Sequence, residues 1–316
     1  VSAPRTLPAH AVADAVAASG AHLVFLSPAA VLNVAATAED LDDAAHAALA
    51  GVRTFLSTGA PVSEALLTSV ARLMPNAGAH TPYGMTECLL VTDIDLAGLR
   101  AAATADDAGV CVGRPIGSNR VLISPLDDDG AATGEPTATP GALGEIVISA
   151  PHVKERYDRL WLTDVASRRG TEGLAPPEAR WHRTGDVGHL DAEGRLWVEG
   201  RLPHVLLTAQ GLVAPVGPEQ KIERVAGVRR AAVVGVGPAG TQQAVAVVET
   251  LPGARRTRLA PADLAEAIRA STALPLAAVF VVPRLPTDIR HNSKIERVRL
   301  AEWADRILAG GRLRSP

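Results

Sequence analysis

An aromatic ring, a hydroxyl and a carboxylate follow one another closely in the run Tyr83-Gly84-Met85-Thr86-Glu87. A phenol ring can stack on a purine, and a glycine lets a ligand approach the backbone. A threonine hydroxyl can bond a phosphate, and a carboxylate such as that of Glu87 can hold Mg²⁺ beside phosphates. The run therefore predicts a nucleotide-phosphate site, although an ordinary turn would account for the same residues.

A second polar run, WHRTGD at residues 181–186, ends in Asp186 and is followed later by Gly200-Arg201. A carboxylate on a tight turn can accept hydrogen bonds from ribose hydroxyls, and a nearby guanidinium can bridge sugar and phosphate. We therefore expect Asp186 and Arg201 to contact a nucleotide. A hairpin turn with surface charges is the alternative interpretation.

Two further loops carry candidate residues. Gly59, Ala60 and Pro61 follow a strand pattern, and their backbone could pack against an adenine ring. Lys294 stands alone in the polar segment 286–297, just before a helical pattern. A cation there could reach a carboxylate or a phosphate, whereas most isolated lysines are simply solvated.

The elements that would position these side chains change in kind along the chain. Residues 6 to about 75 alternate helix and strand patterns, with a helix that Ser63 caps, which is typical of an α/β layer with a largely parallel sheet. From about 110 to 200, short strand patterns are separated by Gly- and Asp-rich turns, which indicates a compact β-rich part. Beyond Arg201, strand and helix patterns alternate again, as in a small α+β domain. Strands are expected at 22–27, 52–57, 231–236, 244–249 and 277–282, and helices at 262–270 and from about 296.

Composition narrows the class of protein. The 316 residues are 47% hydrophobic and 21% charged, as in an ordinary globular protein, and the net charge of −3 favours neither a nucleic acid nor an anionic membrane as partner. Cys88 and Cys111 lack metal-type spacing and fit a reducing compartment. No apolar run approaches the length of a membrane helix. We therefore expect a cytoplasmic protein with no membrane span.

Other catalytic classes find little support. Gly235-Val236-Gly237-Pro238-Ala239-Gly240 matches a dinucleotide fingerprint, but a second strand pattern follows it where a helix should begin, so we interpret it as a hairpin loop. The histidines show no zinc-ligand spacing, and no Gly-x-Ser-x-Gly elbow is present.

Taken in order, these segments resemble the adenylate-forming superfamily of acyl-CoA synthetases, luciferases and peptide-synthetase adenylation domains. The resemblance runs from about Val24 to Trp303. It implies an α/β fold: residues 1–200 as the remnant of the large AMP-binding domain, with a β-rich subdomain at about 110–200, and residues 201–316 as a small α+β cap that carries the late lysine.

The resemblance also implies roles for residues. The loop of Gly59, Ala60 and Pro61 and the pentad Tyr83, Gly84, Met85 and Thr86 would bind the nucleotide, with Tyr83 stacked on adenine and Thr86 at the α-phosphate. Glu87 would hold Mg²⁺, Asp186 the ribose hydroxyls and Arg201 the nucleotide near the domain hinge. Lys294 would bridge the carboxylate and α-phosphate oxygens during adenylation. ATP and Mg²⁺ are the implied cofactors, and Glu87, Asp186 and Lys294 should converge on one adenylate.

The chain departs from the superfamily pattern in one place upstream of Tyr83. Residues 57–62 resemble the end of the superfamily's phosphate loop but lack its lysine and lie too close to Tyr83. The chain also begins without methionine. We expect the phosphate loop to lie on a preceding segment of the same polypeptide or on a separate chain.

One branch of the superfamily is more similar than the rest. Residues 80–94, the pair Pro203-His204, residues 288–295 and residues 300–303 resemble the β-lactone synthetases of bacterial long-chain olefin biosynthesis. The resemblance implies that a 2-alkyl-3-hydroxy fatty acid is adenylated and that its own hydroxyl then displaces AMP. His204, like His291, would act either as a neutral hydrogen-bonding residue or as a base for that hydroxyl.

Two other functions remain open. An ordinary acyl-CoA ligase would use the same residues and differ only in the acceptor. A non-catalytic nucleotide-binding fragment would explain the missing phosphate loop.

Overall fold

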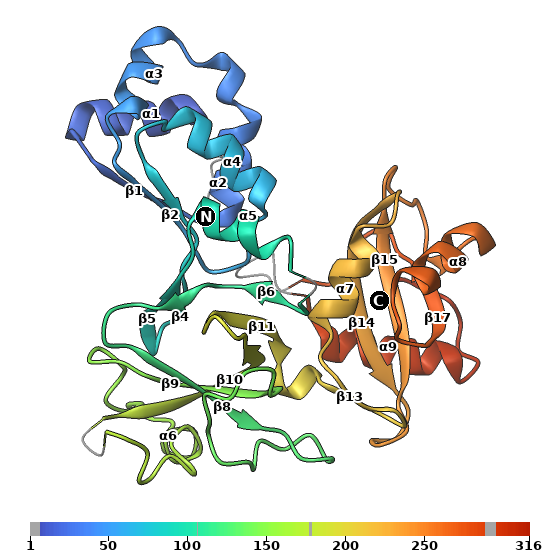
Figure 1. Cartoon of the computed structure of the whole chain (residues 1–316). Coiled ribbons are helices and arrows are strands. Elements are labelled where there is room, and N and C mark those ends of the chain that lie inside the picture. The colour runs from blue at the N-terminus through green and yellow to red at the C-terminus, as the bar shows by residue number, and fades with distance from the viewer. Residues whose placement is uncertain (1–6, 106, 177–178, 288–294) are drawn as a thin grey trace.

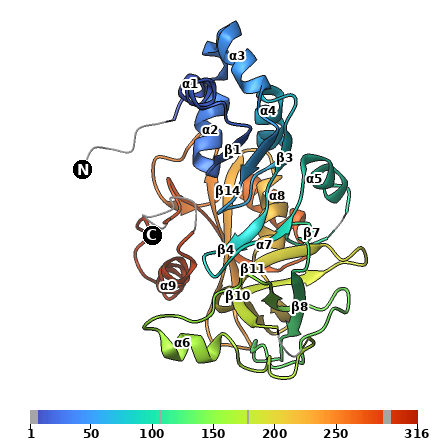
Figure 2. The same ribbon diagram turned by 90° about the vertical axis from the view of Figure 1, so that its left-hand side faces the viewer.

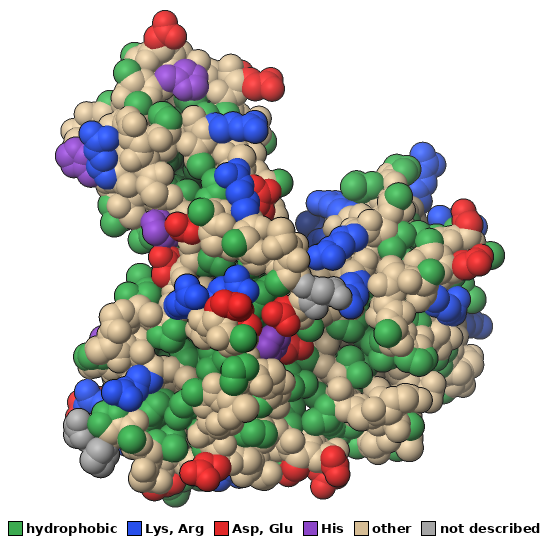
Figure 3. All heavy atoms as spheres, viewed as in Figure 1, with side chains coloured by type: hydrophobic (Ala, Val, Ile, Leu, Met, Phe, Trp, Pro, Cys, Tyr) green, Lys and Arg blue, Asp and Glu red, His purple; other side chains and the backbone are tan. Residues whose placement is uncertain are grey.

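The structure is a computed structural model that describes residues 7–105, 107–176, 179–287 and 295–316. The N-terminal layer is followed by an antiparallel part in the middle of the chain and by a separate C-terminal sheet (Figure 1). Figure 2 shows the same ribbon turned by 90°, with the N-terminal layer above the five-stranded sheet. In Figure 3 the surface is hollowed between the N-terminal layer and the C-terminal sheet. No helix within the described ranges is long and apolar enough to cross a membrane.

The N-terminal layer is a parallel sheet in the order β1-β2-β3 with helices packed on it. Ser63 accepts a hydrogen bond from the Leu66 amide and so caps α4, as expected. Helices α2 and α3, which we had not predicted, are capped in the same way by Ser27 and Asp42. The elements are α1 (Ala9–Ser19), β1 (Leu23–Leu26), α2 (Pro28–Ala36), η1 (Ala38–Asp40), α3 (Asp43–Ala50), β2 (Thr54–Ser57), α4 (Glu64–Leu73) and β3 (Gly78–His80).

The middle of the chain is β-rich, as predicted, and its strands pair antiparallel. A small sheet has the order β4-β5-β7, and a five-stranded sheet has the order β6-β11-β10-β9-β8. Strand β9 is buried along its whole length, because it lies between β10 and β8 and its own Ile146 and Ile148 pack into an apolar cluster. The elements are β4 (Tyr83–Met85), β5 (Cys88–Asp93), α5 (Leu96–Ala102), β6 (Val110–Cys111), β7 (Arg114–Pro115), β8 (Arg120–Pro125), β9 (Gly144–Ser149), α6 (Trp161–Ala166), β10 (Trp181–Leu190) and β11 (Leu196–Arg201).

The C-terminal sheet has the order β14-β15-β17-β16, and apolar clusters cover both of its faces. Strands β14 and β15 pair antiparallel, so the glycine-rich run at 235–240 leads from one strand into the next and not into a helix. The elements are η2 (Leu202–His204), β12 (Leu206–Thr208), β13 (Gly211–Val213), α7 (Val216–Glu223), β14 (Val228–Val236), β15 (Gln243–Thr250), β16 (Arg258–Leu259), α8 (Ala262–Ser271), β17 (Leu276–Val281) and α9 (Arg297–Leu308). The expected α+β pattern is therefore present, and the domain boundary near residue 200 stays a prediction.

Candidate functional site

Tyr83 and Asp186, which are 103 positions apart, lie in direct contact. The Tyr83 hydroxyl on β4 donates a hydrogen bond of 2.6 Å to Oδ2 of Asp186 on β10. Burial and the neighbouring Asp186 carboxylate raise the pKa of Tyr83 well above its ordinary value. The phenol therefore stays protonated and acts as the donor. The two polar runs singled out in the sequence thus meet at one place.

Arg201 completes this contact from the neighbouring strand. Asp186 and Arg201 are register partners on β10 and β11, and Arg201 Nε lies 3.0 Å from Asp186 Oδ1. Only 14% of the Asp186 side chain is exposed, compared with 53% of that of Arg201. The carboxylate is therefore held by the sheet, while most of the arginine remains open to a ligand.

The local backbone around Asp186 differs from our expectation. We predicted a tight turn, but Asp186 lies inside the strand β10. The pairing of β10 with β9 loses its register between Arg183 and Val187, and Gly185 has φ of 71°. Glycine adopts this left-handed conformation without steric strain, so the strand can bulge here and continue instead of turning back.

The predicted adenine loop lies beside the pentad. Gly59, Ala60 and Pro61 belong to the connection between β2 and α4. Next to them, the Thr58 hydroxyl donates a hydrogen bond of 2.6 Å to the carbonyl oxygen of Pro82, the residue before Tyr83. A single side chain thus ties this loop to the start of β4.

Glu87 lies at the turn between β4 and β5, next to Thr86. Tyr157, which we had not predicted, donates a hydrogen bond of 2.7 Å from its hydroxyl to Glu87 Oε1. Partial burial opposes ionisation of Glu87, but this hydrogen bond, a backbone amide and the nearby His182 and Lys154 lower its pKa overall. Glu87 is therefore an anion at neutral pH.

The character of Glu87 suits one kind of metal site. Within the described residues no group of three or more His, Cys, Asp or Glu side chains could hold an ion by itself. Mg²⁺ in nucleotide sites usually takes one or two carboxylates and completes its coordination with phosphate oxygens and water. A single ionised carboxylate at this turn fits that pattern, so Glu87 would hold the ion and Tyr157 would orient Glu87.

His204 follows Arg201 closely, in the short helix η2. Burial and the positive charges of Arg297 and Arg201 lower the pKa of His204 to about 4. The imidazole is therefore neutral at pH 7, which suits a hydrogen-bonding role, and it is a weak base for a substrate hydroxyl. Its catalytic role stays a prediction.

Lys294 and His291 lie outside the described residues. The backbone on either side of their segment is joined, because Thr287 and Ile295 form an antiparallel bridge and the Glu296 amide donates to the Pro286 carbonyl at 2.9 Å. The structure therefore describes where the segment begins and ends. The convergence of Lys294 with Glu87 and Asp186 stays a prediction.

Three functional candidates escaped the sequence analysis: Tyr157, Glu145 and Arg183. Tyr157 meets Glu87 across 70 positions and Glu145 meets Arg183 across 38, so no local spacing connects them. The sequence offered one signal, the presence of Arg183 in the WHRTGD run, whereas its burial inside a strand is seen only in the structure.

Comparisons with known proteins show which family the chain resembles. The profile of the AMP-binding enzyme family matches residues 1–158. The chain is 41% identical over 260 residues to an olefin β-lactone synthetase from Stenotrophomonas maltophilia, with 78% of this chain and 46% of that protein aligned. The identity is 36% to the olefin β-lactone synthetase of Xanthomonas campestris, with 95% of this chain and 54% of that protein aligned. The chain therefore spans about half the length of these curated relatives.

Solved structures of related enzymes share the fold. ATP-bound MatB from Rhodopseudomonas palustris superposes with a TM-score of 0.70 at 21% identity, covering 94% of this chain and 53% of MatB. O-succinylbenzoate coenzyme A synthetase (MenE) from Bacillus subtilis, in complex with ATP and a magnesium ion, gives a TM-score of 0.67 at 20% identity, covering 92% of this chain and 54% of that one. The resemblance drawn from the sequence is thereby confirmed, and the chain belongs to the family of AMP-binding enzymes.

Proposed function

We propose that this chain carries the nucleotide site of an ATP-dependent enzyme that activates a carboxylic acid as an acyl-adenylate. The observation that supports it best is the contact of Tyr83, Asp186 and Arg201, which come from three different strands. An aromatic ring for the base, a carboxylate for the ribose and an exposed guanidinium for sugar and phosphate are what an adenylate requires.

In the first step, a carboxylate oxygen of the substrate attacks the α-phosphorus of ATP, and the bond to pyrophosphate breaks. Negative charge gathers on the phosphorus oxygens in the transition state, and positive charges placed there in advance stabilise it. Mg²⁺ supplies part of this charge when bound, and Glu87 is the residue that would hold it. Thr86 would bond the α-phosphate, and Lys294 would bridge the two reacting groups.

In the second step, we propose that a 2-alkyl-3-hydroxy fatty acid closes on itself. The hydroxyl oxygen attacks the acyl carbon of the adenylate, AMP leaves with the bonding electron pair, and the hydroxyl proton passes to solvent or to a neighbouring base. Two relatives, at 41% and 36% identity, are named olefin β-lactone synthetase, and these names support the hydroxyl as acceptor. An attack within one molecule gains a high effective concentration of the nucleophile, which offsets part of the ring strain.

Thioester formation is the alternative, because another relative is named 2-succinylbenzoate–CoA ligase, from Arabidopsis thaliana, at 28% identity. The two functions differ in the group that accepts the acyl carbon, so the product distinguishes them. The test is to supply the full-length protein with ATP, Mg²⁺, coenzyme A and a 2-alkyl-3-hydroxy fatty acid. We expect pyrophosphate, AMP and a β-lactone. A thioester would contradict the lactone step and keep the adenylation step.

A matched substrate sharpens this experiment. The 2-alkyl fatty acid without the 3-hydroxyl should still release pyrophosphate but should form no lactone. If the protein binds AMP and yet neither acid exchanges pyrophosphate into ATP, adenylation itself is contradicted, and the protein only binds nucleotides.

A further inference from the structure

The ladder between β9 and β10 is interrupted at residues 184–186, which include Asp186. Arg183 pairs with Val147, and the next pair is Val187 with Glu145. Residues 184–186 of β10 therefore face only Ile146 of β9, and their backbone groups lose their regular partners on β9. Buried amides and carbonyls without partners are costly, so something else must satisfy them.

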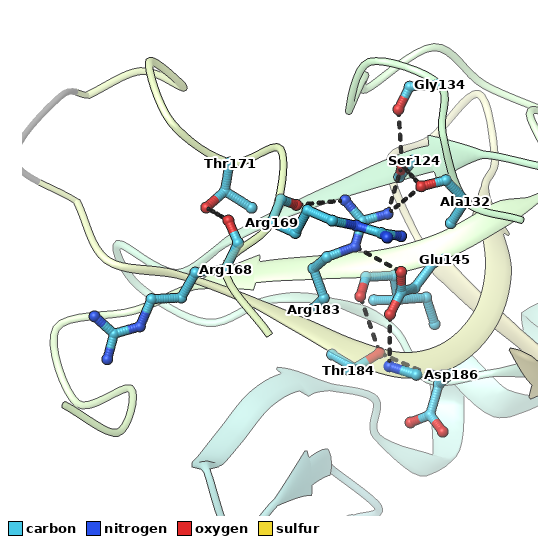
Figure 4. Close-up of polar contacts among 12 residues, drawn as sticks. Ser124, Ala132, Gly134, Glu145, Arg168, Arg169, Thr171, Arg183, Thr184 and Asp186 are labelled. Carbon is cyan, nitrogen blue, oxygen red and sulfur yellow. Dashed lines mark hydrogen bonds and ion pairs between the residues drawn. The ribbon is translucent and has the colours of Figure 1, made fainter. Parts of the chain in front are cut away.

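Side chains take over the missing partners. The Thr184 hydroxyl donates to the Ile146 carbonyl at 2.9 Å and accepts from the Asp186 amide at 3.0 Å. The Gly185 amide donates to Glu145 Oε1 at 3.0 Å. Figure 4 shows these bonds on one side of the strand, with the Asp186 carboxylate pointing away from them. Glu145 therefore holds the peptide next to Asp186.

Arg183 in turn fixes the Glu145 carboxylate. Arg183 Nε donates to Glu145 Oε2 at 2.7 Å, and the two side chains are only 6% and 8% exposed. The remaining guanidinium donors bond the Arg169 carbonyl at 2.9 Å, the Ser124 hydroxyl at 2.8 Å and the Ala132 carbonyl at 2.7 Å. Ser124 and Ala132 are buried like Glu145 and Arg183, so neither charged side chain can rotate without breaking several of these bonds.

A buried ion pair is weak evidence for stability, because taking both charges out of water opposes their attraction. The hydrogen bonds of the Arg183–Glu145 pair show instead which part of the backbone the pair holds in place. One Glu145 oxygen is used by the guanidinium and the other by the amide of Gly185, the residue before Asp186. The pair thus fixes the direction in which the bulge presents its carboxylate.

We propose that Glu145, held by Arg183, is a positioning residue for Asp186. It fixes the Gly185 peptide and so aims the Asp186 carboxylate at the ribose hydroxyls of the bound nucleotide. This inference rests on the proposed function, because it assumes that Asp186 bonds the ribose.

The test measures AMP binding by calorimetry in the full-length protein. Glu145→Ala removes both the acceptor and the charge, and we expect AMP to bind about tenfold more weakly, the usual effect of losing one hydrogen bond to a charged group. Glu145→Gln keeps an acceptor for the Gly185 amide and should restore part of the affinity. The matched control is Glu199→Gln, since Glu199 is buried in the same sheet and pairs with His189 at 2.7 Å. We expect it to lower the melting temperature and leave AMP affinity unchanged.

A second ligand separates positioning from a general loss of structure. 2′,3′-Dideoxyadenosine monophosphate lacks both ribose hydroxyls, so Glu145→Ala and Glu145→Gln should bind it as the natural protein does. An equal loss for both ligands, or no loss of AMP affinity in Glu145→Ala while Asp186→Ala weakens it, would overturn the inference. If Asp186→Ala itself leaves AMP binding unchanged, the ribose role in the proposed function fails, and the inference fails with it.

Discussion

Two arginine–glutamate pairs in different parts of the molecule are chemically alike: Arg183 and Glu145 lie on neighbouring strands of the five-stranded sheet, and Arg297 and Glu219 lie on helices α9 and α7 of the C-terminal part. Arg183 and Glu145 approach to 2.7 Å, and Arg297 and Glu219 to 2.6 Å. In both pairs the carboxylate also accepts a hydrogen bond from a strand amide. The same device therefore occurs on both sides of the molecule.

The two amides differ in where they lie. Glu219 accepts from Val233, which lies in the unbroken central part of the β14–β15 ladder, on a strand at the sheet edge. There the carboxylate covers an edge amide, and the strand remains regular. Glu145 instead accepts from Gly185, within the break in the ladder of an interior strand. The Arg297–Glu219 pair thus covers an edge amide of a regular strand. The Arg183–Glu145 pair stabilises a break in the strand ladder beside Asp186, the residue that we propose binds the nucleotide.

The first prediction compares the arginines directly. Arg297→Met and Arg183→Met each leave a buried carboxylate unpaired, so each should lower the free energy of unfolding by about 3–5 kcal/mol. Only Arg183→Met should also weaken AMP binding. Denaturant titration and calorimetry on the same samples test both statements, and an equal loss of AMP affinity in Arg297→Met would break the comparison.

The second prediction concerns Lys294, which we propose acts on the rate of adenylation. Lys294→Ala should slow adenylation by about 10²–10³-fold, the usual effect of removing one preorganised charge from a transition state, while AMP binding stays nearly constant. Pyrophosphate exchange measures the rate. Unaltered exchange would remove Lys294 from the mechanism.

Asp186 should show the opposite pattern. Asp186→Ala removes hydrogen bonds that exist in the ground state and in the transition state alike, so AMP should bind about a hundredfold more weakly. Calorimetry with AMP checks this. A slower reaction at unchanged AMP affinity would contradict the proposal that Asp186 acts on nucleotide binding and Lys294 on the reaction rate.

Acid should destabilise both regions through their histidines. The pKa of His182 is lowered to about 4 by burial and by Lys154, and that of His204 to about 4 by burial, Arg297 and Arg201. Between about pH 6.5 and pH 4 the unfolded chain therefore binds more protons than the folded one, so stability falls as the pH falls. His182→Gln should reduce this slope by about one proton in denaturant titrations across that window. An unchanged slope would show that His182 is already protonated in the folded state.

The smallest expected effect belongs to Tyr83. Tyr83→Phe keeps the ring that would stack on adenine and removes only the hydroxyl that donates to Asp186. AMP affinity should change by about threefold or less, since the ring carries most of the interaction. A loss as large as that of Asp186→Ala would mean that the hydroxyl, and not the ring, is what the nucleotide site requires.

Local signals explain how much of the fold was predictable. The cap at Ser63 located α4, and the caps at Ser27, Asp42 and Asp95 offered the same signal for α2, α3 and α5, which we overlooked. These helices were readable because a cap depends on residues three positions apart. The middle strands were likewise indicated by the glycine and aspartate turns between them.

The arrangement around Asp186 was not readable in this way. The motif identified the residue, but its place inside a strand depends on Glu145, which bonds the Gly185 amide from 40 positions away. The Tyr157–Glu87 bond spans 70 positions. Sequence patterns report neighbours along the chain, whereas these contacts are set by the register of the sheet.

The left-handed backbone at Gly185 also restricts how this protein can diverge. A β-carbon there would meet only the end of the Arg201 side chain, at 3.4 Å, so space alone would admit a small residue. The φ of 71° would not, because among the other amino acids only asparagine and aspartate visit that conformation readily. In a library of random substitutions, position 185 should therefore retain glycine, with asparagine the commonest survivor and valine and isoleucine absent.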